Sequence, residues 1–185
     1  GMHFSDIGDG ICHQLMGEGA ALPGEIIVGA DSHTCTLGAF GAFATGVGAT
    51  DMAVIWASGS TWFKVPETIA LFLSGRLSGH AEAKDLALTY VSRLGMDGAS
   101  YQALEFIGEG VTHLSMDSRM TLCNLAVETG AKTGLCYADK VTVAYLESFV
   151  KIVETQPPPA CRYKRELDID MGEIVPFIAV PPRVA

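Results

Sequence analysis

The sequence is poor in positive charge, in paired cysteine motifs and in long apolar runs. Only 12 of its 185 residues are Lys or Arg, against 21 Asp or Glu, which gives a net charge of −9. This balance argues against a nucleic-acid partner, because a nucleic-acid surface needs clustered cations. No apolar run can span a bilayer and no basic-then-apolar leader opens the chain, so we expect a soluble, cytoplasmic protein without membrane contact.

Five cysteines are scattered along the chain without any Cys-x-x-Cys pair. They stand at positions 12, 35, 123, 136 and 161. An odd number at such spacing argues against a disulfide framework and against a compact zinc or iron–sulfur site made from this chain alone. We therefore expect most of them to be small buried thiols.

Apolar residues make up 49% of the sequence, enough to build the core of one large domain or two small ones. Strand-like and helix-like segments alternate, which predicts an α/β fold. Strands are expected over residues 25–30, 61–65, 68–73, 103–107, 133–137, 166–171 and 174–180. Helices are expected over residues 51–58, 82–94, 116–129 and 141–150, with Thr50 and Ser115 as N-caps of the first and third. The small residues of segment 38–51 indicate a helix packed closely on a sheet, and residues 157–159 form a proline linker.

The strand over residues 25–30 leads directly into Asp31-Ser32-His33. In an open α/β sheet, ligands bind beyond the carboxyl ends of the strands, so these three side chains are candidates for a ligand-facing rim. An ordinary polar turn explains the same pattern equally well, because strand exits are commonly polar.

Three further polar candidates lie elsewhere in the chain. One is His13, and the others are Asn124 and Glu128, which stand four positions apart and hence on one face of the helix expected over residues 116–129. An amide and a carboxylate among apolar neighbours need partners if they are buried.

Three chemistries fit these residue types. They are acid–base catalysis by His–carboxylate pairs, a metal site made by His13, His33 and a carboxylate, and a Ser/His/Asp hydrolase. The hydrolase fits least well, because Ser32 is flanked directly by Asp31 and His33 and no Gly-x-Ser-x-Gly turn surrounds it.

Five segments, spread over nearly the whole chain, share the sequence of one known family. They are GICHQ at residues 10–14, GADSHTCT at 29–36, GAFATGVG at 41–48, TWFKVPET at 61–68 and MTLCNLAVETGAKTG at 120–134. In this order they resemble the aconitase superfamily, most closely the large subunits of 3-isopropylmalate dehydratase and their homoaconitase-like and dimethylmalate dehydratase relatives. The resemblance implies a three-layer α/β/α fold. It also implies a hydro-lyase that moves water across a double bond of a hydroxy di- or tricarboxylate, as in leucine biosynthesis.

The resemblance also implies roles for the candidate residues. His13 is expected to pair with Asp31 and His33 with Glu128 as catalytic residues, while Ser32 contacts the substrate. Asn124 is expected beside a [4Fe-4S] cluster, whose one non-cysteine iron acts as a Lewis acid. The partners implied are a small carboxylate substrate, the remaining large-subunit domains and a small subunit that carries a swivelling domain.

The sequence departs from the family in its cysteines. The family binds its cluster through a Ser-Cys-Thr-Asn motif and a later Cys-x-x-Cys motif, and neither motif occurs here. We therefore expect no cluster ligand in this chain and no activity of the chain alone. Residues 1–60 are expected to match the latter part of the first aconitase-like domain and residues 61–185 the second, so the fold is incomplete relative to the family. Apolar faces left uncovered would favour a homo-oligomer.

Two other readings stay open. The chain could be a stand-alone, non-catalytic binding or interaction remnant of the same fold, or a hydrolase with a single metal ion. Retention of His13, Asp31, His33 and Glu128 favours part of an enzyme, because folding does not obviously require four such groups. The sequence leaves the substrate open among isopropylmalate, homoaconitate, dimethylmalate and citrate.

Overall fold

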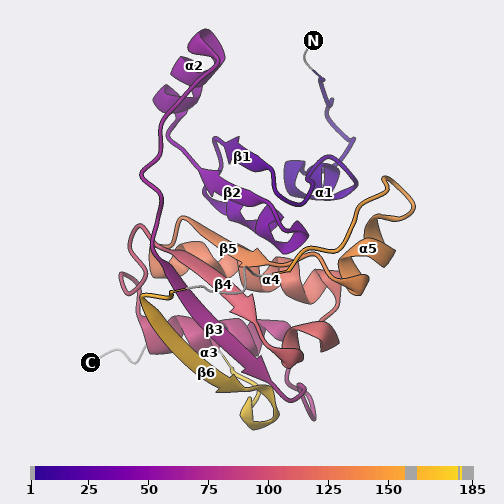
Figure 1. Cartoon of the computed structure of the whole chain (residues 1–185), viewed down its shortest axis with the longest axis vertical. Helices are drawn as coiled ribbons and strands as arrows, with labels where there is room; N and C mark the ends of the chain where they lie inside the picture. Colours follow the sequence, from indigo (N-terminus) through magenta and orange to yellow (C-terminus); the bar gives the residue numbers. More distant parts are fainter. Residues whose placement is uncertain (1–2, 157–161, 179, 181–185) are drawn as a thin grey trace.

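The chain folds as an α/β protein with two parallel sheets, as expected from its alternating segments. The computed structural model describes residues 3–156, 162–178 and 180. The larger sheet has the order β5-β4-β3-β6, and the smaller one pairs β1 with β2 (Figure 1). The strands are β1 (Ile26–Gly29), β2 (Phe43–Gly46), β3 (Thr68–Ser74), β4 (Ala103–Ile107), β5 (Thr133–Cys136) and β6 (Arg165–Asp170).

The centre of the larger sheet is a continuous apolar run. In β3, Ile69, Leu71 and Leu73 are all buried, with at most 1% of each side chain exposed. Leu71 stands opposite Phe106 of β4 on one side and Leu167 of β6 on the other. Such a run is typical of a parallel strand that is covered on both faces. The strands expected over residues 68–73, 103–107, 133–137 and 166–171 are confirmed, and each bound agrees within one residue.

Two helices pack together behind this sheet. They are α3 (Ala83–Leu94), which begins with a capping box between Glu82 and Asp85, and α4 (Met116–Leu125), capped by Ser115 as predicted. The hydroxyl of Tyr90 on α3 donates to the carbonyl of Leu122 on α4 at 2.7 Å, which holds the two helices together. The segment expected as one helix over residues 116–129 changes to the 3₁₀ helix η3 (Ala126–Thr129) in its last turn.

A second 3₁₀ helix, η1 (Ser32–Phe40), joins the two sheets. Gly38 on η1 touches β5 so closely that an added Cβ would lie 1.7 Å from the carbonyl oxygen of Gly134. The close approach expected in segment 38–51 is therefore confirmed, but its geometry differs from the predicted helix. The chain leaves η1 through Gly41, at a φ of +82°, and forms β2, which the sequence reading missed.

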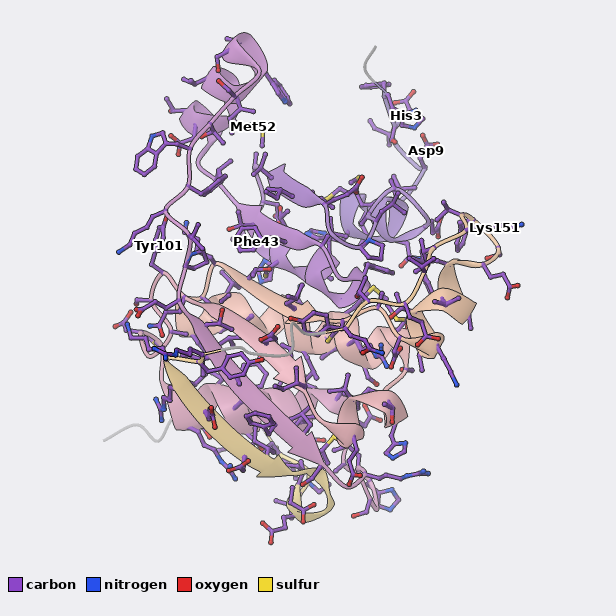
Figure 2. The ribbon with its side chains drawn as sticks, viewed as in Figure 1. His3, Asp9, Phe43, Met52, Tyr101 and Lys151 are labelled. Carbon is purple, nitrogen blue, oxygen red and sulfur yellow. The ribbon has the colours of Figure 1, made fainter. Side chains whose placement is uncertain are left out.

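Helix α2 (Ala49–Ser58) extends away from the rest of the molecule (Figure 1). Met52 is its one buried residue, and Figure 2 shows this side chain on the side that faces the smaller sheet. Gly48 is the N-cap, so the prediction of Thr50 at that position was wrong by two residues. Val54 and Trp56 expose 57% and 79% of their surface, which is unusual for large apolar side chains.

Other predicted elements also need correction. Residues 61–65 form an extended connection and not a strand, because Trp62 and Val65 lie exposed without a neighbouring strand. Residues 174–178 and 180 form no strand either, and the amide of Phe177 instead donates to Asp85. The strand at residues 25–30 is present as β1 but is half-open to solvent, with Ile26 71% exposed. The proline linker at residues 157–159 lies outside the described residues.

The remaining elements are short. They are α1 (Cys12–Gly17), η2 (Glu109–His113), α5 (Lys140–Leu146), which ends four residues earlier than predicted, and η4 (Met171–Glu173). Within the ranges that the structure covers, no helix combines the length and the apolar character needed to cross a bilayer.

Candidate functional site

Asp31, Ser32 and His33 lie at the carboxyl end of β1, where the chain turns into η1. Asp31 is the N-cap of η1, because its Oδ1 accepts a hydrogen bond from the backbone N–H of His33 at 2.7 Å. The turn thus fixes the Asp31 carboxylate relative to the following residue. Gly46 at the end of β2 permits this turn, since an added Cβ there would lie 2.7 Å from the Asp31 carbonyl oxygen.

His13 comes to this carboxylate from α1. Its Nε2 lies 3.1 Å from Oδ1 of Asp31, and its Nδ1 lies 3.4 Å from the sulfur of Cys12. An ionised Asp31 can only accept, so Nε2 carries the hydrogen, and Nδ1 of a neutral ring then accepts from the Cys12 thiol. Asp31 therefore orients the His13 ring.

His33 lies on the other side of Asp31 and faces Glu128 of η3. Its Nδ1 is 3.2 Å from the Ser32 hydroxyl and 3.8 Å from Oδ1 of Asp31, while its Nε2 is 3.9 Å from Oε1 of Glu128. The residues His13, Asp31, His33 and Glu128 thus form one continuous row, which we call the His–carboxylate strip. The strip is open: 53% of the Asp31 side chain and 55% of the Glu128 side chain are exposed.

The geometry does not favour the Ser/His/Asp hydrolase or the metal site that the sequence left open. A Ser/His/Asp triad needs serine and carboxylate on opposite ring nitrogens, whereas Ser32 and Asp31 both lie on the Nδ1 side of His33. No group of three His, Cys, Asp or Glu side chains in the described ranges is placed to hold a metal ion. The arrangement is that of two His–carboxylate pairs, which suits proton transfer.

Asn124 lies near the strip without joining it. Its side-chain amide donates to the Thr36 hydroxyl at 2.9 Å, and the residue lines a cleft of about 400 Å³ together with His13. Asn124 and Glu128 were expected on one face of a single helix. The structure places Asn124 on α4 and Glu128 on η3, because α4 ends between them.

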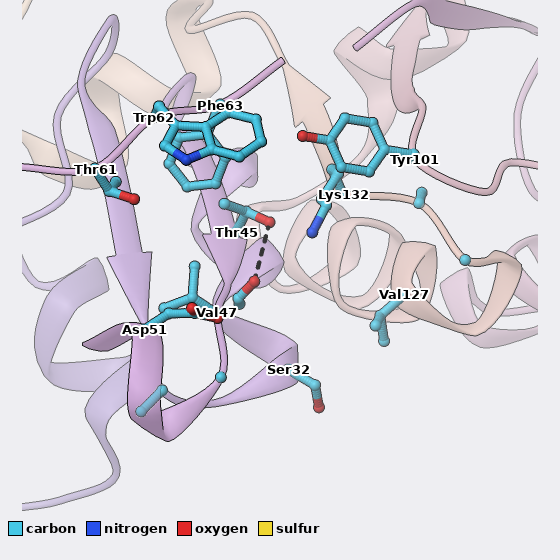
Figure 3. A pocket seen from close by; sticks show the side chains of 15 residues that line it. Ser32, Thr45, Val47, Asp51, Thr61, Trp62, Phe63, Tyr101, Val127 and Lys132 are labelled. Atoms are coloured by element: carbon cyan, nitrogen blue, oxygen red, sulfur yellow. Dashed lines mark hydrogen bonds between the residues drawn. The ribbon is translucent and has the colours of Figure 1, made fainter. Parts of the chain in front are cut away.

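A second cleft, of about 570 Å³, was missed from the sequence. It begins beside the strip, at Ser32 and Val127, and extends between Trp62 and Phe63 of the chain before β3 and Lys132 just before β5 (Figure 3). We call it the Lys132 cleft. The sequence contains the residues of this cleft: the cation Lys132 lies inside GAKTG, and the aromatic pair Trp62 and Phe63 lies inside TWFKVPET. Their spacing along the chain does not show that the cation and the aromatic pair face each other in the fold.

The described cysteines do not converge on this site. Cys12 is exposed on α1, whereas Cys35, Cys123 and Cys136 are buried. Burial raises the pKa of the Cys35 thiol to about 11, so it is a poor thiolate at neutral pH. The sulfurs of Cys123 and Cys136 lie 3.9 Å apart in the core. The residues that the structure describes therefore do not fit a cubane iron–sulfur cluster, which needs several thiolates at one place.

Comparison with known proteins gives a consistent result. The profile of the aconitase family (aconitate hydratase) matches residues 1–185. The chain is 50% identical to a probable methanogen homoaconitase large subunit of Methanosarcina mazei, over 98% of this chain and 47% of that protein. It is 46% identical to 3-isopropylmalate dehydratase large subunit 1 of Methanopyrus kandleri, over 97% of this chain and 44% of that protein. The chain thus spans about half the length of the curated relatives it matches.

Proposed function

Because the chain belongs to the aconitase family, we propose that it supplies one wall of the active site of a hydro-lyase large subunit acting on a hydroxy di- or tricarboxylate. One observation carries this proposal. Side chains from three distant segments, at residues 13, 31–33 and 128, meet in a row of two His–carboxylate pairs beside two clefts.

Such a row suits the chemistry of adding and removing water. Dehydration takes a proton from one carbon and a hydroxyl group from its neighbour, so the site must accept one proton and donate another. His13, oriented by Asp31, and His33, facing Glu128, are the groups proposed to hold these protons. The exposed Ser32 hydroxyl beside His33 is proposed to bind a substrate oxygen.

The family uses a [4Fe-4S] cluster, and the described cysteines do not provide a place for one. The proposal therefore gives this chain proton handling and substrate contact, and assigns it no cluster ligand and no activity alone. Asn124, whose amide donates to Thr36 at the neighbouring cleft, is proposed to lie beside the cluster in the assembled enzyme.

Partners follow from the same proposal. Two relatives are named as large subunits, so we propose a small-subunit partner and further large-subunit domains for this chain as well. The boundary near residue 60 is proposed as a domain boundary, supported by the two separate sheets on either side of it. The exposed Trp56 of α2 and Ile26 of β1 are proposed to be covered in that assembly.

The proposal is tested by turnover of the assembled enzyme, monitored by ultraviolet absorption of the unsaturated intermediate. We expect His13→Asn and Glu128→Gln to lower kcat by about 10²–10⁴-fold, the usual contribution of a positioned acid or base. His80→Asn is the matched control, because His80 is exposed in a turn and lines neither of the two clefts. Full activity of both strip variants would contradict the proposal and favour a non-catalytic binding module.

A further inference from the structure

A thiol stands at one end of the His–carboxylate strip and takes no part in the proposed function. Cys12 is the first residue of α1, and its sulfur lies 3.4 Å from Nδ1 of His13. The other nitrogen of this ring, Nε2, lies 3.1 Å from Oδ1 of Asp31. Thiol and carboxylate therefore contact opposite nitrogens of one imidazole, and we call these three side chains the Cys–His–Asp group.

This order of side chains is the one that a nucleophilic cysteine requires. A thiol attacks an electrophile readily when a neighbouring base takes its proton and a third group orients that base. Because Asp31 accepts the hydrogen on Nε2, Nδ1 of the neutral His13 ring has a lone pair that faces the sulfur. The Ser32 hydroxyl lacks this arrangement, since it lies on the same side of the His33 ring as Asp31.

The Cys–His–Asp group lines a small cavity of about 200 Å³, which we call the Cys12 pocket. All three residues of the group contribute to its wall, and Met16, Ile27 and Leu37 make the rest of the wall mostly apolar. One water molecule occupies about 30 Å³ of liquid, so the pocket admits a molecule of only a few non-hydrogen atoms. The thiol thus opens into a space where a small reactant can be held beside the sulfur.

Cys12 differs in its surroundings from the other cysteines that the structure describes. Cys12 is exposed, whereas Cys35, Cys123 and Cys136 are buried. Burial raises the pKa of the Cys35 thiol to about 11 and raises that of Cys123 well above its ordinary value, which makes both of them poor nucleophiles. Among the described cysteines, access and a neighbouring base therefore occur together at Cys12.

The charge around the Cys12 pocket favours an uncharged reactant. The Asp31 carboxylate lines the pocket, and the chain as a whole carries a net charge of −9. An anion in the pocket would meet a like charge, whereas the apolar wall suits a molecule with a hydrocarbon part. Uncharged α,β-unsaturated carbonyl compounds meet both conditions, and their addition to a thiol needs only a base that takes a proton and returns it.

We propose that Cys12 is a modification site that adds small, uncharged α,β-unsaturated carbonyl compounds, with His13 as the base. The sulfur forms a bond to the β carbon, and the carbon–carbon π bond breaks. The thiol proton passes to Nδ1 of His13 and from there to the α carbon, where the former π electrons form the new C–H bond. The atoms balance without an oxidant or a further reactant. This site goes beyond the proposed function and does not depend on it.

Alkylation rates from intact-protein mass spectrometry test the site without measuring turnover. The full chain is used with Cys161→Ser, so that no label on this residue, which lies outside the described ranges, enters the rate. With acrylamide at pH 7, we expect peptide mapping to place the adduct on Cys12, at a rate at least about tenfold above that of 2-mercaptoethanol. The preference for acrylamide over acrylate should exceed that of 2-mercaptoethanol by about fivefold, the effect of one like charge a few ångströms away in water.

The two histidines of the strip provide matched variants. His13→Asn should lower the alkylation rate about 10–100-fold, because it removes the base. His33→Asn should leave the rate within about twofold of the parent chain, because His33 contacts Ser32 and Glu128 and not the thiol. Circular dichroism checks that both variants fold, and the comparison with 2-mercaptoethanol needs no histidine variant.

Three results would each overturn the inference. They are a rate at Cys12 no higher than that of 2-mercaptoethanol, an adduct on Cys35, Cys123 or Cys136 in place of Cys12, and equal rates for the parent chain and a folded His13→Asn variant. Because turnover is not part of the measurement, loss of this site would leave the proposed function intact, and loss of the proposed function would leave this site intact.

Discussion

Two groups of charged side chains in this molecule differ in burial and in the length of their contacts: the Arg119–Asp139 pair and the His–carboxylate strip. Arg119 on α4 is fully buried, and its guanidinium donates to both oxygens of Asp139 at 2.7 Å. The same guanidinium group also donates to the Thr142 hydroxyl and to the carbonyls of Val111 and Leu114, so its donors are well satisfied. The His–carboxylate strip, in contrast, is about half-exposed and its contacts on His33 are as long as 3.8 and 3.9 Å.

The difference distinguishes a structural ion pair from the group of residues for which we propose a functional role. A buried and fully bonded ion pair has no free donor or acceptor left for a ligand. The side chains of Asp31 and Glu128 in the strip are more than half exposed, and exposed ion pairs of this kind contribute little to stability. Charge alone therefore does not identify a site; the number of unused hydrogen-bonding positions does.

The largest expected effect on stability comes from breaking the buried pair. Arg119→Met should lower the free energy of unfolding by about 3–5 kcal/mol, because it leaves Asp139 partly buried without its partner. Urea denaturation followed by circular dichroism measures this loss. The double variant Arg119→Met/Asp139→Asn is the control: it should recover part of the loss, and full additivity of the two single changes would contradict the pairing.

A smaller loss of stability is expected at acidic pH, where Asp139 becomes protonated. Burial opposes ionisation of Asp139, but the hydrogen bonds and charge of Arg119, with the amides of Thr142 and Val141, outweigh it and lower the pKa of this carboxyl below its usual value. The pair therefore stabilises the fold fully above about pH 4, the ordinary carboxyl range, and this contribution is lost as the pH falls through the lowered pKa.

Asp139→Asn isolates that contribution to acid sensitivity. Asparagine retains the side-chain oxygen that caps α5 through the amides of Val141 and Thr142, but it does not titrate. We expect the variant to be less stable at neutral pH and to lose stability less steeply below pH 4 in thermal melts across a pH series. Parallel slopes for the two proteins would show that Arg119–Asp139 does not contribute to acid unfolding.

The smallest effect on stability should come from the strip. Asp31→Asn keeps the acceptor for the His33 amide and removes only the charge beside His13, so the free energy of unfolding should change by about 0–1 kcal/mol. Urea denaturation of Asp31→Asn and of the Arg119 variants under the same conditions compares their free energies of unfolding. A loss as large as that of Arg119→Met would mean that the strip is mainly structural.

The sequence predicted the elements whose signals are local. The helix expected over residues 82–94 has apolar spacing, a capping residue and a terminal glycine, and α3 is found within one residue of it. In the larger sheet, β3 is an apolar run, as burial on both faces requires, whereas the edge strand β6 alternates buried Leu167 and Ile169 with exposed charged residues. These signals need no knowledge of distant residues.

The elements that the sequence did not predict correctly depend on which segments pack beside them in the fold. Residues 61–65 have strand-like composition but find no neighbouring strand, whereas β2 has small residues and becomes a strand because β1 lies beside it. Similarly, the sequence named the six polar candidates, but it could not show that Lys132 faces Trp62 across a cleft. The pairing roles of His13, Asp31, His33 and Glu128 stay predictions until the variants are measured.

The packing of η1 against α4 also has a consequence for the order of folding. Thr36 accepts from Asn124, 88 residues away, and the Cys35 thiol approaches the Asn124 carbonyl across 89 residues. Contacts between such distant segments form late, because a long loop must first close. A chain still being synthesised, with only its first hundred residues available, therefore carries Asp31 and His33 without the surface that positions them. The arrangement of the His–carboxylate strip therefore depends on contacts that only a chain with α4 and η3 already synthesised can make.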